Sequence, residues 1–195
     1  MKLIDFYRQY ISKTKMTKRD LKSYGSFGNK SVMDLPCIHD NHRSNVYIGD
    51  NTTILKNSRI QLYTSKDGKV GRIKIGNNCF FSYNMSLLAF DDIVIADGVL
   101  FASNVLVTSE NHGIDPESNL YYMDQELSGG AVHIGEGSWI GEKAIILPGV
   151  SIGKKCVVGA GSIVTKTIPD FSIAVGNPAH VIKRYNFDLH QWEKV

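Results

Sequence analysis

His112 is the residue whose type and position best suit it to move a proton. It ends a run of short apolar segments and immediately precedes the long polar stretch 113–133. An imidazole has an ordinary pKa near 6.5, so at neutral pH it can accept a proton from an alcohol, an effect worth about 10²–10⁴ in rate. Its orienting partner is left open between Glu110, Asp115, Glu126 and a backbone carbonyl. The alternative is an ordinary solvated loop histidine.

A second group of chemically capable side chains lies in the run PCIHDNH. Cys37, His39 and His42 offer one thiol and two imidazoles close together in the sequence. A zinc site needs four ligands in a tetrahedral arrangement, and the sequence pairs no fourth ligand with these three. We therefore expect no metal site.

The composition limits what kind of protein can carry these residues. The chain has 195 residues, 43% apolar and 21% charged, which is typical of one globular domain. No apolar stretch approaches the roughly 20 residues of a membrane span, and the N-terminus, with its early Asp5, lacks a secretory-signal pattern. An odd set of three cysteines fits reduced thiols, so we expect a cytoplasmic protein.

The net charge of +3 is unevenly distributed, because residues 1–30 carry eight Lys/Arg and two Asp/Glu. A basic segment of this kind is usually a solvated face, and peripheral contact with the anionic inner face of a membrane is the alternative. Nucleic acid is not an expected partner, since the basic residues lack the interleaved motif of a binding module.

From residue 134 the chain divides into the hexapeptides IGEGSW, IGEKAI, ILPGVS, IGKKCV, VGAGSI and VTKTIP. The first position is Ile or Val in all six, and the fifth is small or aliphatic. Six residues suit one short strand and a turn, and three such units close a triangle that advances the chain by one sheet spacing, about 4.8 Å. First-position aliphatics stack inside the prism, so the pattern predicts a parallel β-helix. Cys79 and Cys156 fall at fifth positions, where a small buried side chain is expected.

The same frame recurs upstream, where Ile48, Ile75 and Ile95 each begin a set of first positions six residues apart. Glycine often follows the first-position aliphatic, and we expect it to allow the unusual dihedral angles of the corner. Residues 113–133 would leave the prism as a protruding loop, which is usually functional. The predicted coils are 48–65, 75–92, 95–112, 134–151 and 152–169.

Both ends of such a prism expose strand edges and need covers. Leu3, Phe6, Tyr7 and Tyr10 are at helical spacing and predict an amphipathic helix over 2–13 that caps one end. The expected organisation is an N-terminal helical cap and lead-in (1–45), a β-helix (46–169) with the loop insertion, and a C-terminal cap (170–195).

At the level of motifs, the sequence resembles the left-handed β-helix, hexapeptide-repeat acyltransferases. The resemblance covers most of 46–184 and is strongest for bacterial O-acetyltransferases of sugars and surface polysaccharides. It implies the left-handed sense of coiling, which is an exception to the usual right-handed crossover and which composition does not show. The residues that carry it are Trp139 through Val150, Ile152-Gly153, Val157 through Lys166, Gly176 through Ile182, and Asn111-His112 before a long insertion.

The resemblance also implies a site. His112 would be the general base, and no metal or cysteine nucleophile would be required. Glu142 and Ala160 are eighteen residues apart, so their backbone groups would form a ladder suited to the amides of a pantetheine arm. The predicted acceptor-binding residues are Asn84 and Asp91. The predicted coenzyme A-binding residues are Trp139, Gly141, Glu142, Gly159, Ala160, Thr165, Lys166 and Lys183.

Several of these assignments have a plain structural alternative. Lys166 and Lys183 could be solvated surface charges, and Trp139 could pack between subunits. Asp92 could replace Asp91 as the matching acid, or both could merely form a turn. Related galactoside acetyltransferases carry Ser where this chain has Glu142, so only a backbone role carries over there.

The implied activity is transfer of an acetyl group from acetyl-CoA to a hydroxyl of a sugar or surface polysaccharide, of the capsule or O-antigen type. A homotrimer with active sites between subunits is expected. The alternatives are a streptogramin-type xenobiotic O-acetyltransferase and a noncatalytic β-helix scaffold. A zinc hydratase of the carbonic-anhydrase type would need three converging histidines, and no second histidine lies within a few residues of His112.

Overall fold

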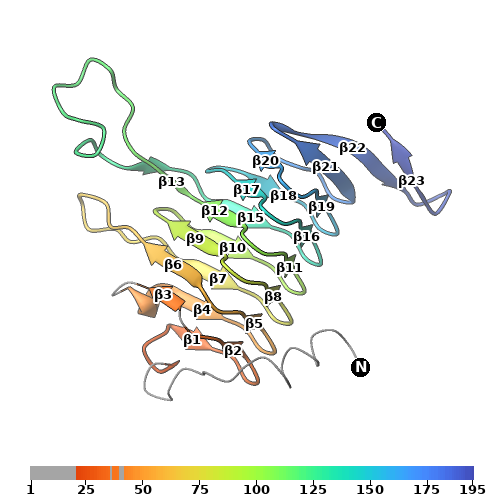
Figure 1. Ribbon diagram of the computed structural model, residues 1–195, viewed down its shortest axis with the longest axis horizontal. Helices are drawn as coiled ribbons and strands as arrows, with labels where there is room; N and C mark the ends of the chain where they lie inside the picture. Colours follow the sequence, from red (N-terminus) through yellow and green to blue (C-terminus); the bar gives the residue numbers. More distant parts are fainter. Residues whose placement is uncertain (1–20, 36, 40–41) are drawn as a thin grey trace.

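The computed structural model describes residues 21–35, 37–39 and 42–195. Three parallel sheets form the three faces of a prism, and the chain visits them in turn (Figure 1). Face I contains β1 (Ser26–Phe27), β4 (Val46–Ile48), β7 (Ile73–Ile75), β10 (Ile93–Ile95), β15 (Val132–Ile134) and β18 (Ser151–Ile152). Face II contains β2 (Val32–Met33), β5 (Thr53–Ile54), β8 (Phe80–Phe81), β11 (Leu100–Phe101), β16 (Trp139–Ile140) and β19 (Val157–Val158). Face III contains β3 (Cys37–His39), β6 (Ser58–Leu62), β9 (Ser86–Ala89), β12 (Leu106–Thr108), β17 (Ile145–Ile146) and β20 (Ile163–Val164).

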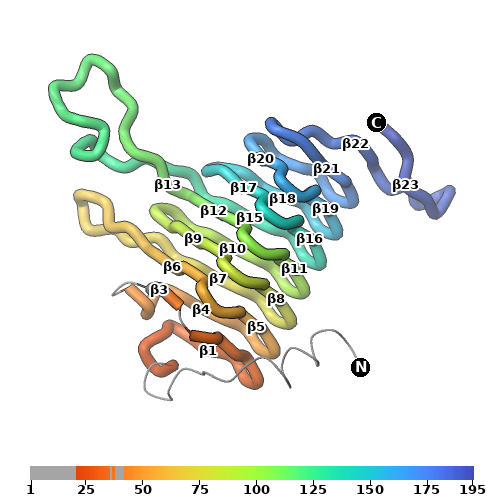
Figure 2. The backbone as a smooth tube through the Cα atoms, viewed as in Figure 1, coloured from red at the N-terminus to blue at the C-terminus, as the bar shows by residue number. Residues whose placement is uncertain are grey.

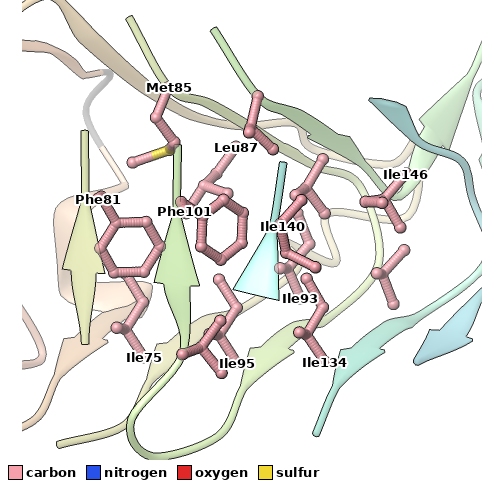
Figure 3. Packing of buried hydrophobic residues seen from close by; sticks show 14 of the residues in the cluster. Ile75, Phe81, Met85, Leu87, Ile93, Ile95, Phe101, Ile134, Ile140 and Ile146 are labelled. Atoms are coloured by element: carbon pink, nitrogen blue, oxygen red, sulfur yellow. The ribbon is translucent and has the colours of Figure 1, made fainter. Parts of the chain in front are cut away.

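The core consists of columns of first-position side chains, as the repeat predicted. Every predicted first-position residue is buried, and Figure 3 shows several of them stacked inside the prism. Phe81 and Phe101 replace aliphatics in adjacent coils, and their rings stack with centroids 4.7 Å apart. The fifth-position Cys79 and Cys156 are buried too, and burial raises the pKa of both thiols. The paired columns are Ile48, Ile75, Ile95, Ile134 and Ile152 on face I; Ile54, Phe81, Phe101, Ile140 and Val158 on face II; and Ile60, Leu87, Val107, Ile146 and Val164 on face III.

The prism begins one coil earlier than the aliphatic repeat indicates. Strands β1, β2 and β3 pair in parallel with β4, β5 and β6. Phe27, Met33 and His39 therefore hold the first positions of this coil, opposite Ile48, Ile54 and Ile60 respectively. An aromatic, a methionine and a histidine do not match an Ile/Val pattern, which is why the sequence does not reveal the coil.

The glycines that follow first positions have a different reason from the one expected. At the second position of the repeat, glycine permits close approach of stacked coils: a Cβ on Gly135 would lie 2.5 Å from the carbonyl carbon of Gly153. The left-handed backbone conformation falls two residues later, at Gly137 with φ 64° and Asn104 with φ 62°. Asparagine and glycine adopt this conformation at low cost, and they recur at these corners.

Two excursions leave the prism where face III turns into face I (Figure 2). The shorter one, 63–72, is closed by an antiparallel bridge between Thr64 and Val70. The longer one follows β12, and its base is a two-stranded antiparallel ladder of β13 (Glu110–Asn111) and β14 (Ser128–Gly129). The predicted protruding loop is therefore present, although 132–133 already belong to β15.

The C-terminal region continues the sheet of face II. Strand β21 (Ser172–Gly176) pairs in parallel with β19, after which β22 (Ala179–Asn186) and β23 (Gln191–Lys194) add antiparallel strands. A short 3₁₀ turn, η1 (Arg43–Asn45), immediately precedes β4. The predicted helix 2–13 lies outside the described residues, and none of the described helical segments is long and apolar enough to cross a bilayer.

Candidate active site

The predicted coenzyme ladder lies at the corner where face II turns into face III, here called the II–III corner. Ala160 follows Glu142 by one coil, and the Gly161 N–H donates a hydrogen bond of 2.7 Å to the Glu142 carbonyl. Both residues are exposed at this corner. A Cβ on Gly141 would lie 2.6 Å from the Ala160 nitrogen, and one on Gly159 would meet Val175 Cγ1 at 2.6 Å. The corner is a closely stacked ladder of turns, as the eighteen-residue spacing predicted.

A line of polar side chains runs up the same corner. Asn84 Nδ2 donates to Asn104 Oδ1 at 3.1 Å, and Asn104 Nδ2 donates to Glu142 Oε1 at 3.5 Å. Asn84, a predicted acceptor residue, is thus connected to Glu142, a predicted coenzyme residue. Asn104 was not among the predicted site residues. The sequence signal for Asn104 is that it occupies the fourth position of its hexapeptide, as Asn84 does one coil below.

His112 lies at the other end of face III, at the III–I corner, immediately after β13. Its side chain is exposed at the base of the long excursion. The three acids considered as its partner have other contacts. Glu110 accepts a hydrogen bond from Thr108 Oγ1 through its carbonyl, Asp115 accepts one from the Glu117 N–H, and Glu126 pairs with Lys66 Nζ at 3.8 Å.

Asp91 and Asp92 are also at the III–I corner, at the opposite end of β9 from Asn84. Asp91 Oδ1 lies 3.2 Å from Lys69 Nζ, and Asp92 Oδ2 lies 2.6 Å from Arg72 Nη2. Hydrogen bonds from Arg72 lower the pKa of the Asp92 carboxyl. The two predicted acceptor residues, Asn84 and Asp91, therefore occupy different corners within one chain.

The remaining predicted coenzyme residues are also divided. Thr165 and Lys166 are exposed after β20, at the III–I corner. Trp139 is 49% exposed on the outer surface of face II, and Lys183 on β22 pairs with Ile173 and Lys194. Within one chain, a face III strand of about 3.3 Å per residue separates the two corners by roughly 15–20 Å. The structure therefore brings together Gly141, Glu142, Gly159, Ala160 and Asn84, and keeps them apart from His112, Asp91, Thr165 and Lys166.

The described residues of the run PCIHDNH form no group that could hold a metal ion. Burial raises the pKa of the Cys37 thiol to about 12, which disfavours the thiolate that binds metal. His42 Nε2 lies 3.2 Å from Thr64 Oγ1, and the side chain of His39 lies outside those described. In the described part of the chain, no three His, Cys, Asp or Glu side chains are grouped to hold a metal ion.

The fold defines a class of protein, the parallel β-helices built from hexapeptide repeats, and comparison with known proteins identifies the family. Residues 131–166 match the family described as the hexapeptide repeat of succinyl-transferase. WbbJ of Escherichia coli (strain K12), named for lipopolysaccharide biosynthesis and O-acetyl transfer, is 33% identical over 174 residues, which cover 86% of each chain. This chain belongs to the hexapeptide-repeat acyltransferase family, and its fold is the left-handed parallel β-helix that was predicted.

Two further comparisons concern a sequence relative and a solved structure. The galactoside O-acetyltransferase of Lactococcus lactis subsp. lactis (strain IL1403) is 35% identical over 124 residues, covering 64% of this chain and 58% of the relative. AntD, an N-acyltransferase from Bacillus cereus solved with dTDP and 3-hydroxybutyryl-CoA, superposes with a TM-score of 0.75 at 21% identity, covering 90% of this chain and 92% of that one. At this identity, the AntD likeness concerns the fold.

Proposed function

We propose that this protein transfers an acetyl group from acetyl-CoA to a hydroxyl of a sugar in a surface polysaccharide, with His112 as the general base. The observation that carries the proposal is the stacked ladder at the II–III corner in a chain of this family. Glu142 and Ala160 are exposed residues one coil apart, a spacing that suits the successive amides of a pantetheine arm. Acetyl-CoA would supply an activated thioester there.

In the proposed reaction His112 performs one proton transfer. Its imidazole accepts the proton of the sugar hydroxyl as that oxygen forms its bond to the acetyl carbonyl carbon, and the carbon–sulfur bond breaks. The same proton can then pass to the departing sulfur. A thiolate with an ordinary pKa of about 8.5 leaves readily, so no separate strong acid is demanded. A backbone N–H of the ladder would stabilise the developing oxyanion.

A homotrimer with sites between subunits resolves the separation of the two corners. His112 of one subunit would face the II–III corner of its neighbour, together with Asn84 and Glu142. The outer surface of face II supports an interface, because Leu100 and Trp139 are paired in adjacent strands and are both exposed in the single chain. Side chains of this kind are enriched at subunit interfaces.

Further observations support the acceptor class and the cellular location. The names of the relatives, lipopolysaccharide biosynthesis and galactoside O-acetylation, favour a carbohydrate acceptor over a xenobiotic one. Cys37, Cys79 and Cys156 are all free thiols, which favours the cytoplasm.

Calorimetry with acetyl-CoA tests the proposal without knowledge of the acceptor. We expect micromolar binding by the wild type and at least about tenfold weaker binding by Lys166→Ala/Lys183→Ala, since both cations would face the coenzyme phosphates. Lys30→Ala/Lys74→Ala removes two exposed lysines on other parts of the prism and should leave binding unchanged. Acetyl transfer to glycans, with His112→Ala as the blank, follows. Absence of acetyl-CoA binding would overturn the proposal in favour of a noncatalytic scaffold.

A further inference from the structure

The outer end of the long excursion carries a group of exposed apolar and aromatic side chains. Ile114 is 81% exposed, Tyr121 80% and Tyr122 59%, and Leu120 and Met123 are exposed beside them. Scattered exposed apolar residues are ordinary, whereas a cluster on a protruding segment marks an interaction site. Figure 2 shows this segment standing away from the prism, so the cluster is not needed to cover the core.

Three of these side chains, those of Leu120, Tyr121 and Tyr122, border an open hollow. Its volume is ≈ 250 Å³, and it is lined by Asp115, Pro116, Ser118, Leu120, Tyr121 and Tyr122. Hydrogen bonds from the Gln125 side chain fix the backbone around the hollow. Its Oε1 accepts a hydrogen bond from the Asp115 N–H at 2.9 Å. Its Nε2 donates to the carbonyls of Asp115 at 2.9 Å and of Leu120 at 3.3 Å. The Tyr121 carbonyl accepts further hydrogen bonds from the N–H groups of Asp124 and Gln125. The hollow is therefore a preorganised one.

The charge of the excursion restricts what the hollow can hold. Residues 110–131 contain five Asp or Glu and no Lys or Arg, and Lys66 of the short excursion pairs with one of these acids, Glu126, which leaves a net negative charge. A phosphate-bearing ligand or an anionic membrane surface would be repelled by this field. Aromatic rings, short hydroxyl side chains and a carboxylate suit a neutral, hydroxyl-rich ligand, because a ring face attracts the C–H groups of a pyranose and the carboxylate accepts its hydroxyl protons.

We propose that this hollow binds a neutral sugar residue of the acceptor glycan, next to the residue that reacts at His112. The inference rests on the proposed function and specifies its acceptor: a chain of neutral sugars rather than a nucleotide-linked monosaccharide. Tyr121 and Tyr122 form the stacking surface, and Asp115 and Ser118 meet the hydroxyl groups. Asp115 is three residues from His112, which limits their separation to about 11 Å, so one glycan can reach both.

A glycan array tests the proposal on the intact protein. The probes are neutral oligosaccharides, oligosaccharides containing uronic acids, and nucleotide-linked monosaccharides, printed side by side. We expect wild-type binding to neutral oligosaccharides above the other two classes, and at least about tenfold weaker binding by Tyr121→Ala/Tyr122→Ala. The matched control is Ile114→Ala/Met123→Ala, because both residues are exposed on the same segment and neither lines the hollow. It should bind like the wild type.

The outcomes separate this proposal from the proposed function. If acetyl-CoA binds but the tyrosine variant retains wild-type glycan binding, or nucleotide-linked sugars bind best, the hollow is not a glycan site although the acyltransferase assignment survives. If the tyrosine variant changes only the sedimentation coefficient, the cluster is a subunit contact and this proposal is wrong. Failure of acetyl-CoA binding overturns the proposed function itself. Because Tyr121 and Tyr122 are exposed, an unchanged melting temperature should accompany the loss of glycan binding.

Discussion

Gly141 packs directly beneath Ala160 of the next coil, so that a methyl group added to Gly141 would lie 2.6 Å from the Ala160 amide nitrogen. No real Cβ tolerates such an approach to a backbone atom without movement of one coil. The contact sets the spacing of the two turns that carry Glu142 and Ala160. One glycine therefore serves both the stacking of the prism and the proposed coenzyme ladder.

Gly141→Ala should lower the free energy of unfolding by about 1–3 kcal/mol, the usual cost of forcing a methyl group into a well-packed interior. It should also weaken acetyl-CoA binding, because the ladder must open to admit the Cβ. Urea unfolding and calorimetry measure the two effects. The control is Gly68→Ala on the short excursion, where nothing among the described residues lies within 4 Å and φ is +83°. It should cost about 1 kcal/mol through backbone strain alone and leave binding intact.

Phe101→Ala should destabilise the protein by about 3–5 kcal/mol, because the side chain is fully buried and stacks on Phe81 across adjacent coils. Chemical denaturation measures the free energy of unfolding. Every probe of the prism should report the same single unfolding transition. Leu189→Ala, at an exposed site near the C-terminus, should change stability by less than about 0.5 kcal/mol. Equal effects from the two variants would contradict the stacked-column core.

The columns of the core could be predicted from the sequence because their period is short and exact. Ile134, Ile140 and Ile146 each occupy the same position in the repeat, and the burial of one fixes that of the others. The coil of β1–β3 could not be found this way, since Phe27 and Met33 fill the same positions with other side-chain types. The reason for glycine at the second position was also misjudged. Close approach between coils depends on a neighbour eighteen or more residues away, which local dihedral preferences do not report.

The site was predictable only in part. The spacing of Glu142 and Ala160 gave their stacking directly, because eighteen residues make one full coil. That spacing alone does not identify Asn104, which has the same repeat position as Asn84 and whose side-chain hydrogen bonds to Asn84 and Glu142 are visible only in the structure. The repeat does predict that the His112 loop and the ladder lie on different faces, which is why sites between subunits are expected, but the distance across face III depends on the shape of the closed prism and could not be predicted.

Arg72 and Asp92 form a short ion pair that gives the protein a pH-dependent contribution to stability. Hydrogen bonds from Arg72 lower the pKa of Asp92 in the folded state, so the contribution is present above the ordinary aspartate pKa of about 3.9 and is lost as the pH falls through the lowered value. Arg72→Gln should therefore be less stable than the wild type at neutral pH, and the difference should vanish in acid. Urea unfolding at several pH values measures it.

The control for this prediction is Lys154→Gln. Lys154 Nζ lies 3.9 Å from Asp170 Oδ2, with both side chains about half exposed, so solvent screens the pair. Its stability difference from the wild type should be small at every pH. A difference for Arg72→Gln that stays constant into acid would show that Arg72 acts through packing rather than through the charge of Asp92.

Complementation between two inactive variants tests whether each active site is shared by two subunits. His112→Ala removes the proposed base, and Ala160→Glu places a carboxylate on the exposed ladder of the II–III corner. Each variant alone should be inactive. If His112 of one subunit serves the ladder of its neighbour, co-refolding equal amounts should restore about a quarter of the wild-type sites, because each half-site is intact half of the time. A site contained within one chain would give no recovery. Mixing His112→Ala with His112→Asn supplies the matched control, since no hybrid then contains a histidine at position 112, and recovered activity there would reject His112 as the base.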